Sequence, residues 1–233
     1  MCIAIQSKRG TTPSKKALKI SFENNQDGCG YAFAYDGKII IKKGFFSFDE
    51  FYKSYIKDNI QHLNKLIHFR IRTSGEIDLK NCHPFLINDE IAMIHNGVIP
   101  NFGNKKESDT IQFIDLILRP ILNEHGFKIL YNPTFKKTIM DNIGQSKLAF
   151  INNKGQSYII NESLGNYHKG IWYSNRTYCD NPYSFNYRNY MTTYKLDDYY
   201  NNCIYCDSYL DIDGDFCSDC TDDYDGYGYK PRA

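Results

Sequence analysis

No stretch of this 233-residue sequence approaches the run of about 18 apolar residues that a membrane-spanning helix needs. The amino-terminal residues also lack the apolar segment of a secretion signal. These absences predict a cytoplasmic protein, of the cell itself or of an infected host cell, without a membrane partner. Thiols stay reduced there, so the 8 cysteines are expected to serve as nucleophile, metal ligands or core residues rather than as disulfides.

The charge is near zero overall but differs between the two ends of the chain. Residues 1–179 carry a net charge of +8, whereas residues 180–233 carry −7 and most of the tyrosines. This change predicts a main domain of residues 2–178 and an acidic, tyrosine-rich tail of residues 179–233. An acidic tail disfavours nucleic acid as a partner. The bias toward Asn, Lys, Ile and Tyr fits an AT-rich genome such as that of a virus.

The second residue, Cys2, carries a thiol and becomes the N-terminal residue if the initiator Met1 is removed. The freed α-amine would titrate at about 7.7–8.0, which suits a general base near neutral pH. A thiol of pKa about 8.5 beside such a base is a nucleophile that needs no histidine. The alternative is that cysteine stands at this position by chance.

Apolar stretches bounded by turn residues predict several strands and helices. The expected strands are Met1–Ile5, Tyr31–Tyr35, Lys38–Lys42, one that ends the stretch Leu63–Arg72, Ile91–Ile94, Phe150–Asn152, Gln156–Ile160 and Gly170–Asn175. The expected helices are Lys15–Asn24, Phe48–Asn59 and one that Ser108 caps and Pro120 ends.

Polar residues stand where two of these strands end. Arg70 and Arg72 would face the same side of a strand, and arginine offers a planar fork that suits a carboxylate. Asn96 and Gly97 follow an apolar strand, and the two N–H groups they offer can bind a developing oxyanion. The alternatives are solvated edge charges for the arginines and an ordinary Asn-Gly hairpin turn for the second pair.

Asp109 follows the predicted N-cap Ser108. A carboxylate in the first turn of a helix is explained by capping alone. It could also bind the ammonium group of a substrate.

In their order along the chain, Cys2, the Arg70 segment, Asn96-Gly97 and Asp109 resemble the class II glutamine amidotransferase domain, the N-terminal-nucleophile (Ntn) hydrolase type. The resemblance spans residues 2–178. It implies an α+β fold: an αββα sandwich of two antiparallel sheets. It further implies that L-glutamine is the substrate, that catalysis needs no cofactor, and that ammonia is released for an acceptor.

The resemblance also implies a role for each matching residue. Cys2 would attack the side-chain amide of glutamine, and Asn96 and Gly97 would form the oxyanion hole. Arg70 would hold the substrate α-carboxylate, with Thr73 and Ser74 lining the same segment, and Asp109 would bind the α-amine. His83 matches a His-Pro pair of several members and is expected to support its loop. Arg72 departs from the family pattern, as does Cys29.

The tail holds four cysteines in two Cys-x-x-Cys pairs: Cys203, Cys206, Cys217 and Cys220. Four thiolates at this spacing fit a tetrahedral structural Zn²⁺, and a metal could supply folding energy to so small a segment. The sequence therefore predicts a zinc ribbon over residues 203–220. An acidic ribbon favours a protein partner.

The tail is too short for a domain that consumes ammonia, which predicts a stand-alone glutaminase with a separate acceptor protein. Two alternatives remain: an amidase of another γ-glutamyl compound with the same Cys2 chemistry, and a partner-binding module with a vestigial site. The tail itself would dock the partner or, alternatively, cover the Cys2 pocket as a lid.

Overall fold

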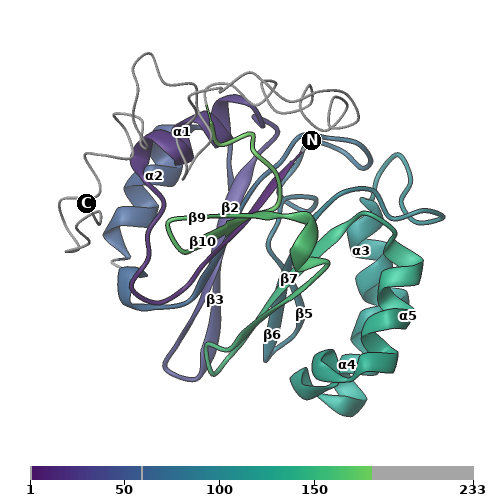
Figure 1. Cartoon of the computed structure of the whole chain (residues 1–233). Helices are drawn as coiled ribbons and strands as arrows, with labels where there is room; N and C mark the ends of the chain where they lie inside the picture. The colour runs from purple at the N-terminus through teal and green to yellow at the C-terminus, as the bar shows by residue number, and fades with distance from the viewer. Residues whose placement is uncertain (1, 59, 180–233) are drawn as a thin grey trace, which may run out of the picture. The chain divides into compact units, whose positions relative to one another are not determined.

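The computed structural model describes residues 2–58 and 60–179 of the chain. The chain divides into two units, Met1–Tyr178 and Cys179–Ala233, and every element below belongs to the first. Two antiparallel sheets lie at the centre of this unit, and helices cover the outer face of each (Figure 1). The predicted α+β class, with its sandwich of two antiparallel sheets, is confirmed.

The first sheet brings the two ends of this unit together. Its strand order is β3-β2-β4-β1-β10-β9. The bounds are β1 (Ile3–Ser7), β2 (Cys29–Tyr35), β3 (Lys38–Phe45), β4 (Lys65–Phe69), β9 (Asn166–His168) and β10 (Ile171–Tyr173). Strand β1 pairs with β4 on one side, Ile3 opposite Phe69, and with β10 on the other, Ile5 opposite Tyr173. The residue before β1 therefore lies beside the segments that follow β4 and β10.

The second sheet has the strand order β5-β6-β7-β8. Its strands are β5 (Phe85–Asn88), β6 (Ile91–Asn96), β7 (Lys147–Asn152) and β8 (Ser157–Ile160). Strands β5 and β9 were not predicted.

Small side chains let the two sheets approach each other. The buried cluster between them consists of alanines and larger apolar residues: Ala4, Ala32, Leu66, Ala92, Ile94, Ala149, Ile151, Ile159 and Trp172. Trp172, the single tryptophan of the chain, is fully buried, and its indole Nε1 donates a hydrogen bond of 3.0 Å to the Glu162 carbonyl. This layer fixes how the strand ends of one sheet meet those of the other.

Aromatic packing attaches α1 (Lys15–Glu23) and α2 (Phe48–Lys57) to the outer face of the first sheet. The ring centroids of Tyr31 and Tyr55 lie 5.5 Å apart, and those of Phe51 and Phe69 lie 5.1 Å apart. Both helices were predicted from their apolar periodicity. The short 3-10 helix η1 (Ile60–His62) follows α2.

A second helical layer covers the other sheet. It contains α3 (Asp109–Phe113), the π-helical turn η2 (Ile114–Leu118), α4 (Arg119–His125), η3 (Phe127–Tyr131) and α5 (Pro133–Ile143). A further 3-10 turn, η4 (Glu162–Leu164), precedes β9. Helix α5 was not predicted. None of the helices in the described ranges is long and apolar enough to span a membrane.

The prediction that Pro120 ends the helix after Ser108 was wrong. Pro120 lies in the first turn of α4, directly after the π-helical turn η2. Proline is tolerated in a first turn because the N–H that it lacks needs no intrahelical partner there. The wider π turn allows the chain to restart as a helix at this proline.

Candidate active site

Cys2 lies just before β1, and its thiol contacts the segment after β4. The Sγ atom accepts a hydrogen bond from the Ile71 N–H at 3.2 Å and donates one to the Ile71 carbonyl at 3.1 Å. Burial raises the pKa of the Cys2 thiol; the hydrogen bond from Ile71 and the charge of Arg70 act in the opposite direction without cancelling it. The resting side chain is therefore a neutral thiol, which needs a base before it can attack.

Arg70 organises the segment that follows it. Its side chain is buried, and its Nη1 and Nη2 atoms donate to the carbonyls of Glu76 at 2.9 Å and Ser74 at 2.8 Å. Its own N–H donates to the Gly28 carbonyl at 2.9 Å. The guanidinium therefore fixes the turn that contains Ser74. Thr73, in the same turn, is exposed.

The prediction that Arg70 and Arg72 face the same side was wrong. Strand β4 ends at Phe69, so the alternation of a strand no longer holds beyond it. Arg70 is buried, whereas Arg72 is exposed and its backbone N–H donates to Asp27 Oδ2 at 2.7 Å. Only Arg70 turns its guanidinium into the site.

Asn96 ends β6 and is buried, with its Nδ2 donating to Ser174 Oγ at 2.6 Å. Gly97 follows with φ +140°, a conformation that side chains rarely adopt. A Cβ at Gly97 would come within 2.7 Å of Ser146 Cα, so the passage requires glycine. Because the chain leads from here to α3, the hairpin-turn alternative for Asn96-Gly97 is excluded.

Asp109 begins α3 and contacts the segment after Arg70. Its backbone N–H donates to Ser74 Oγ at 3.2 Å, which joins the two predicted substrate-binding segments. Its buried carboxylate accepts from the N–H groups of Ile99 at 2.7 Å and Thr110 at 2.8 Å. Ser108 caps the helix as predicted, accepting from the Ile111 N–H at 3.4 Å. The Asp109 carboxylate thus braces its own loop.

Three histidines close to these residues are buried: His68, His83 and His95. The rings of His68 and His83 are in contact, with centroids 4.0 Å apart and planes tilted by 30°. His68 Nε2 contacts the His95 carbonyl at 2.9 Å, and His95 Nδ1 contacts Thr110 Oγ1 at 2.8 Å. Burial lowers the pKa of His68 to about 3 and that of His95 to about 4, and it also lowers the pKa of His83. At neutral pH all three are uncharged and support the strand ends.

The structure also places three residues at the site that the sequence did not indicate: Asp27, Ser174 and Asn175. The Asp27 carboxylate accepts a hydrogen bond from the Arg72 N–H, in the segment after β4. Asn175 Nδ2 donates to the Cys2 carbonyl at 2.6 Å. Each contact joins residues far apart in the sequence, and no local pattern signals it.

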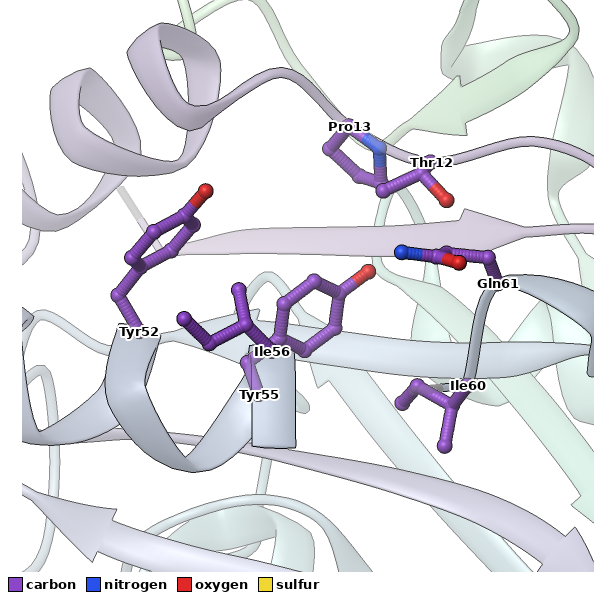
Figure 2. A pocket seen from close by; sticks show the side chains of 7 residues that line it. All are labelled: Thr12, Pro13, Tyr52, Tyr55, Ile56, Ile60 and Gln61. Carbon is purple, nitrogen blue, oxygen red and sulfur yellow. The ribbon is translucent and has the colours of Figure 1, made fainter. Parts of the chain in front are cut away.

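A small pocket lies elsewhere on the same unit (Figure 2). It has a volume of about 80 Å³ and is lined by Thr12, Pro13, Tyr52, Tyr55, Ile56, Ile60 and Gln61. It contains none of the predicted site residues. The pocket is therefore separate from the candidate active site.

No group of histidine, cysteine and acidic side chains in the described ranges could hold a metal ion. The predicted zinc ligands Cys203, Cys206, Cys217 and Cys220 lie outside those ranges.

The fold and these contacts define an α+β sandwich in which hydrogen bonds link the segments that carry Cys2, Arg70, Asn96 and Asp109. No family model matches the chain. Part of it is similar to glutamine–fructose-6-phosphate aminotransferase (isomerizing) of Chlamydia abortus, with 35% identity over 81 residues. The enzyme of the same name from Pyrococcus horikoshii is 39% identical over 84 residues.

Each of these matches covers 34% of this chain but only 13% and 14% of the two relatives. Among solved structures, the glutamine phosphoribosylpyrophosphate amidotransferase from B. subtilis aligns with a TM-score of 0.42 and 16% identity. That alignment covers 74% of this chain and 41% of the other.

Proposed function

We propose that this chain is a glutaminase of the class II amidotransferase type, which releases ammonia from L-glutamine for a separate acceptor protein. The observation that carries the proposal is the hydrogen bonding of Cys2 to Ile71, directly after Arg70, whose guanidinium holds the turn that reaches Asp109 through Ser74. Hydrogen bonds thus join the segments that carry a nucleophile and two charged residues suited to bind an amino acid. The glutamine-dependent relatives support the same substrate.

In the proposed reaction, removal of Met1 frees the α-amine of Cys2 as the general base. The amine takes the thiol proton as sulfur adds to the glutamine side-chain carbonyl, and it passes that proton to the departing ammonia. The resulting thioester is hydrolysed by water, which yields glutamate and restores the thiol. The raised pKa of the thiol makes such a base necessary.

The other site residues would bind the charged groups of the substrate and the oxyanion that develops during attack. One amide hydrogen of Asn96 binds Ser174, and since the nitrogen carries two, the second would bind the developing oxyanion together with the Gly97 N–H. The guanidinium N–H groups of Arg70 not used by Ser74 and Glu76 would bind the substrate α-carboxylate. Asp109 would bind the α-amine with the carboxylate lone pairs that the N–H groups of Ile99 and Thr110 do not occupy.

For the tail we propose the zinc ribbon over residues 203–220, with the acceptor protein as its partner. The support is chemical: four thiolates in two Cys-x-x-Cys pairs are a donor set that Zn²⁺ prefers. No cofactor takes part in the glutaminase chemistry itself.

The test is ammonia and glutamate release from L-glutamine, with intact mass measured on the same sample. We expect activity only in protein that has lost Met1, and none in Cys2→Ala. Cys29→Ala is the matched control, because its buried sulfur lies against the Phe45 carbonyl and takes no part in the chemistry. Active protein that retains Met1 would refute the mechanism.

A panel of γ-glutamyl peptides and thiol conjugates separates the alternative substrate class. Higher kcat/KM for one of these than for free glutamine would replace glutamine as the substrate but keep Cys2 as the nucleophile. No turnover of any panel member by processed protein would identify a vestigial site.

A further inference from the structure

Ser174 and Asn175 directly follow β10 and lie at the site that the proposed function uses. Antiparallel pairing of β10 with β1 places this dipeptide beside the start of β1. The Ser174 N–H donates to the Ala4 carbonyl at 2.9 Å, which continues that pairing beyond the strand. The two side chains then contact different parts of the site.

Asn175 holds the backbone of the nucleophile. Its Nδ2 donates to the Cys2 carbonyl at 2.6 Å. Its Oδ1 accepts from the Thr177 N–H at 3.0 Å and the Thr177 hydroxyl at 2.7 Å, so the orientation of the amide is fixed on both sides. A bond to this carbonyl fixes the peptide plane after Cys2, and so the backbone from which the thiol projects.

Ser174 holds the predicted oxyanion residue. Its buried Oγ accepts from Asn96 Nδ2 at 2.6 Å and from the Ala4 N–H at 2.8 Å. With these two donors, both lone pairs of the hydroxyl oxygen are used. This contact joins β6 of one sheet to β1 and β10 of the other.

We infer that Ser174 and Asn175 are positioning residues that set the distance and orientation between the Cys2 thiol and the Asn96 amide. This inference rests on the proposed function. The nucleophile and the oxyanion residue belong to different sheets, and this dipeptide is hydrogen-bonded to both. Attack geometry is sensitive to small displacements, and an error of about 1 Å can cost about 10²-fold in rate.

The first experiment compares Asn175→Asp and Asn175→Ala with the wild type. Aspartate keeps the shape and the acceptor for Thr177 but cannot donate to the Cys2 carbonyl. We expect both variants to lower kcat by about 10–100-fold with KM nearly unchanged, because the loss concerns attack rather than substrate binding.

Alkylation of Cys2 by iodoacetamide, located by mass spectrometry, gives a readout that needs no turnover. In Asn175→Ala the thiol should lose its aligned hydrogen bond from the Ile71 N–H, which helps to lower its pKa. We therefore expect the pH profile of alkylation to move to higher pH. If the wild type releases no ammonia, the proposed function fails, while this profile still tests the positioning role.

Asn166→Ala is the matched control. Asn166 pairs with Tyr173 of β10, its Nδ2 donates to the Tyr173 carbonyl at 3.4 Å, and its Oδ1 accepts from Arg176 Nε at 3.1 Å. Within the described residues these side-chain contacts involve neither Cys2 nor Asn96. We expect it to leave kcat and the alkylation profile unchanged. The inference is overturned if Asn175→Asp and Asn175→Ala behave as the wild type, or if Asn166→Ala reproduces their effects.

Ser174→Ala tests the second half of the inference. The Asn96 amide would lose its acceptor and turn more freely, so kcat should fall by about 10–100-fold while the KM for glutamine stays within about 3-fold. An equal rise in KM, or no change in kcat in a folded protein, would contradict the positioning of Asn96 by Ser174.

Discussion

Arg70 and Arg72 show how two residues of the same type, two positions apart, take different parts in the structure. The Arg70 guanidinium binds the carbonyls of Ser74 and Glu76, whereas Arg72 contacts Asp27 only through its backbone N–H. Lysine keeps the charge of arginine but not its fork. We therefore expect Arg70→Lys to raise the KM for glutamine at least about 10-fold, and Arg72→Lys to change it little. Steady-state kinetics on both folded variants checks this, and the reverse order would assign the α-carboxylate to Arg72.

Asn96→Ala removes a donor that matters only when negative charge develops. We expect kcat to fall by about 10²–10³-fold with a modest change in KM. The measurement is glutaminase kinetics together with a thermal unfolding curve. A matching loss of glutamine affinity would instead indicate that Asn96 mainly shapes the binding site.

The site residues that the sequence predicts differ in a physical way from the two that only the structure brings to them. Cys2, Arg70, Asn96 and Asp109 each stand in a local pattern: a chain start, a strand end or a helix cap. Ser174 contacts Asn96 and Asn175 contacts Cys2 because β10 pairs with β1, although the two strands lie near opposite ends of the described sequence. Such long-range pairing leaves no trace in local spacing.

At the scale of elements, the passage from β6 toward α3 depends on a glycine. Gly97 combines φ +140° with close contact to Ser146, whereas Gly126, at φ +68°, has open space around its Cα. Alanine at Gly126 should cost about 1–3 kcal/mol of unfolding free energy, from backbone strain alone, because its ψ of −176° lies in a region that only glycine adopts readily. Gly97→Ala adds a steric clash and should cost more and displace Asn96. Urea unfolding of both variants tests this. Equal losses of unfolding free energy would show that Ser146 moves aside for the added methyl group.

Three helix starts were predicted, from a capping side chain or from apolar periodicity, but one helix end and one whole helix were read wrongly. Ser108 and the apolar periodicity of α1 and α2 gave reliable starts. Pro120 was read as a stop because a proline interrupts a regular helix, but the π-helical turn before it resets the register. Helix α5 begins at Pro133 after the cap Asn132 and is amphipathic, so its omission was an error of pattern reading.

At the scale of the whole unit, the three buried histidines predict sensitivity to acid. The pKa of His68 is about 3 and that of His95 about 4 in the folded protein, below the value of about 6.5 in an unfolded chain. A lowered folded pKa means that the unfolded state binds protons first. The contribution of these histidines to stability should therefore be constant above about pH 6.5 and fall below it, by up to about 1.4 kcal/mol per pH unit for each histidine.

Urea unfolding between pH 8 and pH 5 measures this effect. Within the described residues neither ring nitrogen of His83 has a hydrogen-bond partner, so His83→Leu removes a protonation site without breaking a bond. This variant should show a shallower loss with acid. His125→Gln, at an exposed position, should keep the wild-type slope. A flat wild-type profile would contradict the prediction.

For the tail, we expect about one Zn²⁺ per chain, lost on Cys203→Ser or Cys217→Ser. Removal of residues 180–233 should leave kcat for free glutamine largely intact and abolish association with the ammonia acceptor. Metal analysis, steady-state kinetics and co-purification from the native source test these expectations. A direct change in kcat on truncation would favour the lid alternative.

The buried Trp172 is an intrinsic fluorescence probe of the two-sheet core. It is the only tryptophan in the chain, and it lies fully buried between the sheets. Excited at wavelengths that the 20 tyrosines do not absorb, the folded protein should emit from a single, water-excluded indole. A red shift of that emission would report separation of the sheets near Ser174. The same signal would be silent to any event confined to the tyrosine-rich tail.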